Sequence, residues 1–199
     1  MNISLKQNTY DLSFQKRLAA KAAIFADGQR KNVQIYHLDK NKDMDAFEDA
    51  LFQTHWDGNF YRQDIIAFCP EIEGAMEDEL YTLEAQEKTL GYVKIKKKSD
   101  SIQVDFIESA PTYSSYSNNR KTKYIGETLL AFLAKMAQDE EKDLTISEVA
   151  DREKTKNFYY NQCGFKNLGK NNAKLPYNRL GNLIQQNEKH TGKRIELIG

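Results

Sequence analysis

The sequence predicts a single α/β (α+β) domain in which helices flank a mixed, mostly antiparallel sheet. Between residues 80 and 107, apolar segments follow one another with short connections, which is typical of an antiparallel meander. From residue 125 onward the pattern changes to helix, strand and helix, which favours a mixed sheet. The 199 residues are enough for one domain with a substantial core, and they contain no internal repeat or low-complexity linker.

The first third of the chain is expected to hold two helices and one or two strands. Four apolar residues recur at helical spacing before a glycine, which predicts a helix over residues 11–27 ending at Gly28, within an N-terminal helical region 1–32. These residues are Phe14, Leu18, Ala22 and Phe25. The alternation VQIYHL predicts a strand over residues 33–38. A second helix is expected over residues 43–55, and DIIAFC predicts a short strand that stops at Pro70.

The meander is predicted to contain three strands, over residues 80–85, 90–96 and 101–107. In the third strand Ile102, Val104 and Phe106 alternate, but Ile107 follows Phe106 directly. The apolar phase therefore slips by one residue, which predicts a β-bulge at this point.

The C-terminal half reads as alternating helices and strands. A helix is predicted from Ile125 to Met136, and LTISEVA predicts the strand that follows it. The next helix is expected over residues 154–163, with Asp151 as N-cap and Gly164 as its stop. The tail is expected to add a helix near residues 178–188 and a last strand near residues 194–198.

The composition limits the classes of partner. The chain has 29 basic and 29 acidic residues, so no overall field attracts nucleic acid or anionic lipid, and no helix-turn-helix or RNP pattern is present. No apolar run approaches 18 residues and the N-terminus lacks a secretory signal, so we expect a cytoplasmic protein without a membrane segment. The two cysteines and three histidines lack metal-ligand spacing, so no metal site is expected.

The stretch RKTKYIGETLLAF places basic residues and one glycine at the start of a helix. The first N–H groups of a helix are unpaired and carry the positive end of the macrodipole, which makes this a natural anion site. Gly126 would allow close approach of a phosphate, and Arg120, Lys121 and Lys123 would add charge. The alternative interpretation is a solvated basic loop that precedes a core helix.

The order of these elements and two motifs together resemble the Gcn5-related N-acetyltransferase (GNAT) family over roughly residues 33–169. KTKYIG is similar to the family's pyrophosphate loop, with Lys121 at its first position and Gly126 at its last. Tyr124 stands where the family has its first glycine. NFYYNQCGFK is similar to the family's FYxxxGF segment, which aligns Tyr160 with a tyrosine that lies near the CoA sulfur. Residues 170–199 form a variable C-terminal extension.

The resemblance implies an N-acetyltransferase that uses acetyl-CoA as acetyl donor. It also implies a bulged, splayed strand pair, here residues 106–109 and 146–149, which forms the cofactor cleft. The residues expected to bind the cofactor are Ile107, Ser109, Lys121, Thr122, Lys123, Tyr124, Ile125, Gly126, Glu127 and Tyr160.

Acetyl transfer to an amine needs a proton for the leaving thiolate and a way to deprotonate the amine. Tyr160 is the candidate general acid, and the alternative is that it is an ordinary packing aromatic. Glu108 and Glu148 are candidate general bases on neighbouring strands, acting directly or through water, and the alternatives are solvated carboxylates or water alone.

The acceptor is expected to be a small-molecule or protein amine that the sequence does not identify. The acidic stretch at residues 71–79 would favour a cationic amine if it bordered the site, and otherwise it is a solvated loop. A non-catalytic GNAT-like domain that binds acyl-CoA or a protein is the other function class. The sequence leaves a homodimer open.

Overall fold

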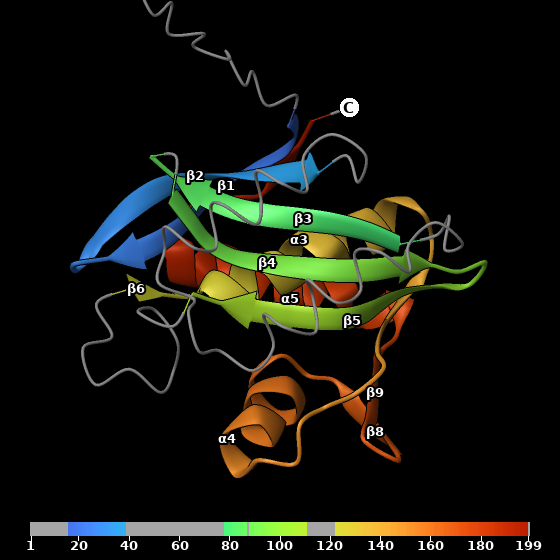
Figure 1. Cartoon of the computed structure of the whole chain (residues 1–199). Helices are drawn as coiled ribbons and strands as arrows, with labels where there is room; N and C mark the ends of the chain where they lie inside the picture. Colours follow the sequence, from blue (N-terminus) through green and yellow to red (C-terminus); the bar gives the residue numbers. More distant parts are fainter. Residues whose placement is uncertain (1–15, 39–77, 87, 111–121, 199) are drawn as a thin grey trace, which may run out of the picture.

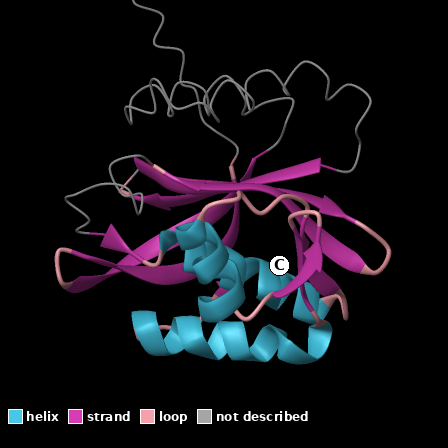
Figure 2. Ribbon diagram, turned by 90° about the horizontal axis from the view of Figure 1, so that it is seen from below, coloured by secondary structure: helices cyan, strands magenta, loops and turns pink. Residues whose placement is uncertain are grey.

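The computed structural model describes residues 16–38, 78–86, 88–110 and 122–198. Several predictions fall outside these ranges: the helix over residues 43–55, the strand DIIAFC, most of the acidic stretch, Arg120 and Lys121. The described residues form a ten-stranded sheet with helices on one of its faces (Figures 1 and 2).

The strands follow the order β10-β1-β2-β3-β4-β5-β7-β9-β8, and β6 pairs with β1. Neighbouring strands are antiparallel except for the parallel pair β5 and β7. This confirms the predicted mixed, mostly antiparallel sheet. Their bounds are β1 Arg17–Ala26, β2 Gln29–Leu38, β3 Asp78–Ala85, β4 Lys88–Lys97, β5 Ser101–Ser109, β6 Thr122–Lys123, β7 Asp143–Ile146, β8 Lys166–Gly169, β9 Asn172–Leu175 and β10 Glu196–Leu197.

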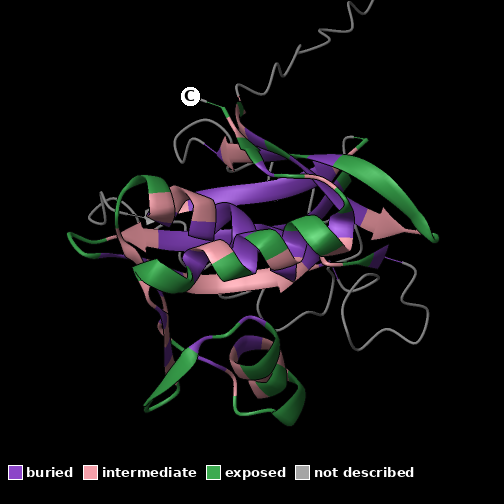
Figure 3. Cartoon of the chain, turned by 180° about the vertical axis from the view of Figure 1, so that it is seen from behind, coloured by how far each residue is buried: buried purple, intermediate pink, exposed green. Residues whose placement is uncertain are grey.

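Within the described residues the helices come from the C-terminal half, where helices near residues 125–136, 154–163 and 178–188 were predicted. Their bounds are α3 Ile125–Asp139, α4 Glu153–Lys156 with its π-helical continuation η3 Asn157–Gln162, the 3₁₀ turn η4 Tyr177–Arg179, and α5 Leu180–Thr191. Helix α3 lies between the sheet and α5, so its side chains are buried on almost every side, whereas α5 exposes its outer face (Figure 3). The three layers are therefore sheet, α3 and α5.

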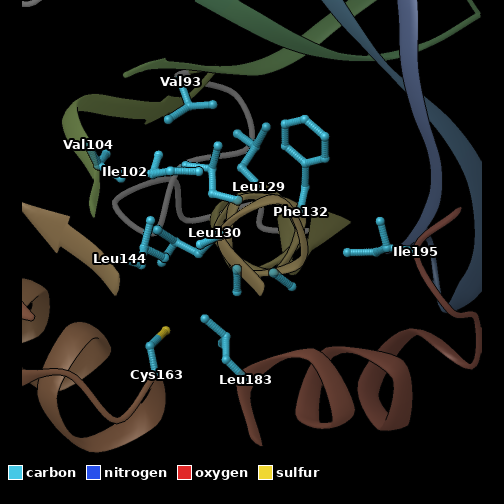
Figure 4. Close-up of a cluster of buried hydrophobic side chains, with 14 of the residues drawn as sticks. Val93, Ile102, Val104, Leu129, Leu130, Phe132, Leu144, Cys163, Leu183 and Ile195 are labelled. Carbon is cyan, nitrogen blue, oxygen red and sulfur yellow. The ribbon is translucent and has the colours of Figure 1, made fainter. Parts of the chain in front are cut away.

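The core is built around α3. Leu129, Leu130 and Phe132 have at most 1% of their surface exposed. They pack with Val93 and Val104 of the sheet, while residues of the C-terminal elements complete the cluster below the helix (Figure 4). Burial of this apolar surface around α3 stabilises the packing of the sheet and of α5 against it.

The predicted helix over residues 11–27 is wrong for its described part, which forms strand β1. Asp27 and Gly28 have φ of 53° and 74° and connect β1 to β2 in a two-residue hairpin, so Gly28 does not cap a helix. The alanines of β1 favour a helix locally, but this segment pairs with both β2 and β10, and those pairings override the local preference.

Three other predicted details need correction. The bulge lies one residue earlier than predicted: Lys94 pairs with Phe106 and Ile95 with Val104, which leaves Asp105 as the extra residue. Strand β7 ends at Ile146 instead of continuing through residue 150. The N-cap position of the helix before Gly164 is Arg152, which makes no side-chain capping bond, and not Asp151, whose carboxylate forms an ion pair with Lys156.

Candidate functional site

The first backbone N–H groups of α3 have no acceptor within the helix. The first hydrogen bond of the helix runs from the Thr128 N–H to the Tyr124 carbonyl oxygen over 2.8 Å. The N–H groups of Ile125, Gly126 and Glu127 therefore precede the intrahelical ladder. Among the described residues, the N-cap Tyr124 provides no side-chain cap. Three N–H groups and the positive end of the helix dipole are thus available to an anion.

Tyr124 adopts the backbone conformation that a glycine would favour. Its φ of 72° and ψ of 13° lie in the left-handed region, which costs an ordinary residue about 1–2 kcal/mol. Its ring contacts two others: Phe25 of β1 approaches edge-on, with centroids 6.4 Å apart, and His190 of α5 stacks on it at 4.9 Å. The tyrosine at this position therefore preserves a glycine-like path.

Of the two glycines at the same helix start, Gly91 is required for close packing. A Cβ at Gly91 of β4 would lie 2.7 Å from Ile125 Cγ2 and 2.8 Å from the Glu108 carbonyl oxygen, so only glycine lets α3 come this close to the sheet. A Cβ at Gly126 would meet the Phe158 ring of η3 at 3.6 Å, an ordinary contact. The start of α3 thus lies between β4 and η3.

Several predicted cofactor residues turn their side chains inward. Thr122, Ile125 and Glu127 are at most 5% exposed, so they can offer a ligand only backbone groups. Thr122 and Lys123 form β6, which pairs with the end of β1, and the Lys123 side chain is exposed. Lys121 lies outside the described residues.

Strands β5 and β7 pair at one end and separate at the other. Their parallel register runs from Ser101 and Asp143 to Val104 and Ile146, and Ser147 closes it with an N–H bond of 3.1 Å to the Val104 carbonyl. Beyond this point β5 continues to Ser109, whereas the Val149 N–H turns to the Asn171 carbonyl at 2.6 Å. The bulge at Asp105 lies where the two strands part. Predicted residues Ile107 and Ser109 lie on the part of β5 that has left β7.

The two candidate bases lie in different settings. Glu108 receives a hydrogen bond of 2.8 Å from the Tyr92 hydroxyl. The neighbours of Tyr92 on β4, Gly91 and Val93, face α3, so Tyr92 and Glu108 face the opposite side of the sheet. Glu148 is exposed and follows the end of β7. It therefore does not lie on a strand, although the sequence predicted that it would.

The segment NFYYNQ separates its two tyrosines. Tyr159 is 7% exposed and packs edge-on against Phe165, with centroids 5.9 Å apart. Its burial raises the pKa of its phenol, and burial likewise raises the pKa of the neighbouring Cys163 thiol. Tyr160 is only partly buried and packs at the edge of the core. Of the two tyrosines, Tyr160, the predicted general acid, is the one whose phenol is partly accessible.

Sequence reasoning missed three residues at this end of α3: Gly91, Phe158 and His190. Gly91 did carry a signal, because a glycine inside a strand often marks close approach of another backbone or element. The contact of His190 with Glu127 spans 63 positions and left no local pattern. In the ranges that the structure describes, no group of histidine, cysteine, aspartate or glutamate is arranged to bind a metal ion. Within the same ranges no helix is long and apolar enough to cross a membrane.

Solved structures share this arrangement of elements. An uncharacterized protein from Bacillus halodurans superimposes with a TM-score of 0.56 at 14% identity, covering 88% of this chain and 99% of its own. A probable acetyltransferase of the GNAT family from Chromobacterium violaceum gives 0.54 at 14% identity, covering 84% and 99%. A putative GNAT acetyltransferase from Desulfovibrio desulfuricans gives 0.52 at 14% identity, covering 71% and 94%. The chain has the GNAT fold.

No family model and no curated protein matches the sequence. The similarity to GNAT proteins is therefore one of three-dimensional structure. The sequence identities are too low to assign an activity of these proteins to this chain. In this GNAT fold, the separated strands β5 and β7, the start of α3 and the segment η3 form one region. This region is the candidate functional site.

Proposed function

We propose that the chain is an N-acetyltransferase that moves an acetyl group from acetyl-CoA to a primary amine. The observation that carries the proposal is the position of the α3 start: a left-handed residue and a glycine open the helix beside the point where β5 and β7 part. The GNAT description of two of the structural neighbours, from Chromobacterium violaceum and Desulfovibrio desulfuricans, supports the same reaction class.

The residues at the helix start fit a pyrophosphate group. Three N–H groups precede the helical ladder, Gly126 has no side chain to block them, and Lys123 contributes an exposed cation nearby. The pantetheine arm would then run along the part of β5 that has separated from β7, where Ile107 and Ser109 offer strand backbone.

Acetyl-CoA supplies an acetyl group activated as a thioester. The protein's part is to hold the acetyl carbonyl beside the amine and to move two protons. Tyr160, the accessible phenol of η3, would donate its proton to the leaving thiolate sulfur. Glu108 would take a proton from the incoming amine, directly or through a water molecule, and Tyr92 would orient its carboxylate. Glu148 is the second candidate base.

The acceptor would approach from the face of the sheet that carries Glu108, opposite α3. On this face Glu84, which is 7% exposed, forms an ion pair of 2.6 Å with Lys16. Its charge is therefore already paired and favours no one class of amine. The acceptor is therefore best found by screening small amines and lysine peptides.

The first experiment is calorimetric titration of the protein with acetyl-CoA, 3′-dephospho-CoA and desulfo-CoA. Saturable binding of all three is expected, because the proposed anchor is the pyrophosphate that they share. An amine screen that detects released thiol then tests for transfer. Binding without turnover for any amine would favour the alternative function, a non-catalytic acyl-CoA-binding domain, and absence of binding would refute both.

The role of Tyr160 can be tested once an acceptor is found. Tyr160→Phe removes only the phenolic oxygen, so kcat should fall by about 10²- to 10⁴-fold while the Kd for acetyl-CoA stays constant. Tyr177→Phe is the matched control, because Tyr177 is 44% exposed and lies outside the site. Equal turnover in wild type and Tyr160→Phe would remove Tyr160 from the mechanism.

A further inference from the structure

Helix α5, which lies in the C-terminal extension, is joined to the start of α3 by a cluster of polar side chains. His190 Nδ1 lies 2.9 and 3.1 Å from the two carboxylate oxygens of Glu127. A carboxylate only accepts hydrogen bonds, so Nδ1 carries the proton and donates it. Asn187 and Gln186 each donate to the same carboxylate at 3.4 Å, and Asn187 also donates to the Thr128 hydroxyl at 3.1 Å.

This cluster addresses an electrostatic difficulty of the proposed site. Glu127 belongs to the first turn of α3, the turn expected to receive a pyrophosphate, and its side chain is only 6% exposed. A buried carboxylate is poorly screened, so its charge would repel an anion bound at the same turn. The donors on α5 offset that charge.

The same histidine ring also fixes the backbone. It stacks on Tyr124 at 4.9 Å with an interplanar angle of 18°, and Phe25 contacts the same tyrosine edge-on. The left-handed conformation of Tyr124 sets the backbone path into the first turn of α3, where the next three N–H groups lie. One side chain from α5 thus touches both the residue that sets the backbone path and the carboxylate beside it.

We propose that His190 is a positioning residue for the acetyl donor: it offsets the charge of Glu127 and holds Tyr124, so that the start of α3 accepts the pyrophosphate. This inference rests on the proposed function and deepens it, because it makes the C-terminal extension part of the donor site. His190 itself is not expected to touch the ligand.

The test is calorimetric titration of acetyl-CoA into single and double variants of the full chain. His190→Ala should weaken binding about five- to tenfold, since it leaves a buried carboxylate less well compensated and frees Tyr124. His190→Ala combined with Glu127→Gln should recover a large part of the affinity, because the uncompensated charge is then gone. Gln185→Ala, at an exposed position of the same helix, should bind as wild type does.

The double variant separates positioning from a merely structural role. If His190 only stabilised the fold, His190→Ala would lower the urea midpoint while the folded protein bound acetyl-CoA as wild type does, and adding Glu127→Gln would change the midpoint but not the affinity. Affinity in His190→Ala equal to that of wild type would overturn the inference and leave the proposed function intact. Failure of wild type itself to bind acetyl-CoA would instead refute the proposed function.

Discussion

At one end of the strand pair β5 and β7 the backbone ladder is complete, whereas at the other end the strands part. The paired end lies over apolar side chains of the core: Ile102, Leu144 and Ile146 are at most 3% exposed. The parted end faces the start of α3, which holds Gly126, the left-handed Tyr124 and the buried carboxylate of Glu127. One helix thus has two different surroundings: its body packs against the sheet, and its first turn leaves three N–H groups without a partner inside the helix.

The largest effect is expected from a truncation at the paired end. Leu144→Ala removes a fully buried side chain between β5 and β9, so it should lower the free energy of unfolding by about 2–5 kcal/mol. Urea unfolding monitored by circular dichroism measures this loss, and Leu168→Ala, at a residue that is 59% exposed, is the control. Equal midpoints for the two variants would show that the paired end is not the stabilising half.

The next effect concerns the spacing between β4 and α3. Gly91→Ala places a methyl group within 3 Å of both Ile125 and the Glu108 carbonyl, so α3 must shift, at a cost of about 1–3 kcal/mol. The same shift should weaken acetyl-CoA binding, because it moves the helix start. Urea unfolding and calorimetry on one preparation measure both quantities. A variant with wild-type stability would mean that the close approach of α3 is not constrained at Gly91.

The smallest effect is electrostatic and lies at the start of β7. Partial burial of Asp143 disfavours its charge, but the hydrogen bonds from Lys174 and the Tyr177 N–H, with the charge of Lys174, outweigh it and hold the pKa of Asp143 below its usual 3.8. Because the folded-state pKa is depressed, this stabilisation is present at neutral pH and is lost as the pH falls through that lower pKa.

Asp143→Asn tests this contribution. It should cost about 0.2–1 kcal/mol at pH 7, since both side chains of the pair are partly exposed to solvent, and the difference from wild type should shrink below the ordinary pKa of 3.8. Urea midpoints of wild type and Asp143→Asn, measured across this pH range, report the difference in stability. A difference that persisted unchanged at acid pH would assign the loss to packing instead of charge.

The elements with strong local patterns were the ones that sequence predicted well. Strands β3, β4 and β5 alternate, and α3 has an unbroken helical period, because each of them presents one face to the same core. Strand β1 was missed since its alanines favour a helix, although Asp27 and Gly28 form the dipeptide that most strongly signals a hairpin. The hairpin β8 and β9 was also not predicted.

Only those residues of the candidate site that belong to short sequence motifs could be predicted. Gly126 and Tyr160 follow from short motifs, and their roles remain predictions. The compensation of Glu127 by His190, the edge contact of Phe25 with Tyr124 and the packing of Phe158 on Gly126 depend on pairings between distant elements. Such contacts have no local period, because they arise only once α5, β1 and η3 assemble around the same helix start.

The central claim is that the first turn of α3 is kept open for a ligand and not for packing, and Gly126→Ala tests it most directly. The added methyl would meet Phe158 at an ordinary 3.6 Å, and alanine is a better helix former than glycine by about 1 kcal/mol, so stability should be unchanged or slightly higher. Gly181→Ala in α5, where the nearest atom is 3.9 Å away, is the matched control.

The measurement is acetyl-CoA affinity by calorimetry together with the urea midpoint. We expect the affinity to fall at least about tenfold in Gly126→Ala alone, with stability retained in both variants. Wild-type affinity in Gly126→Ala would contradict it.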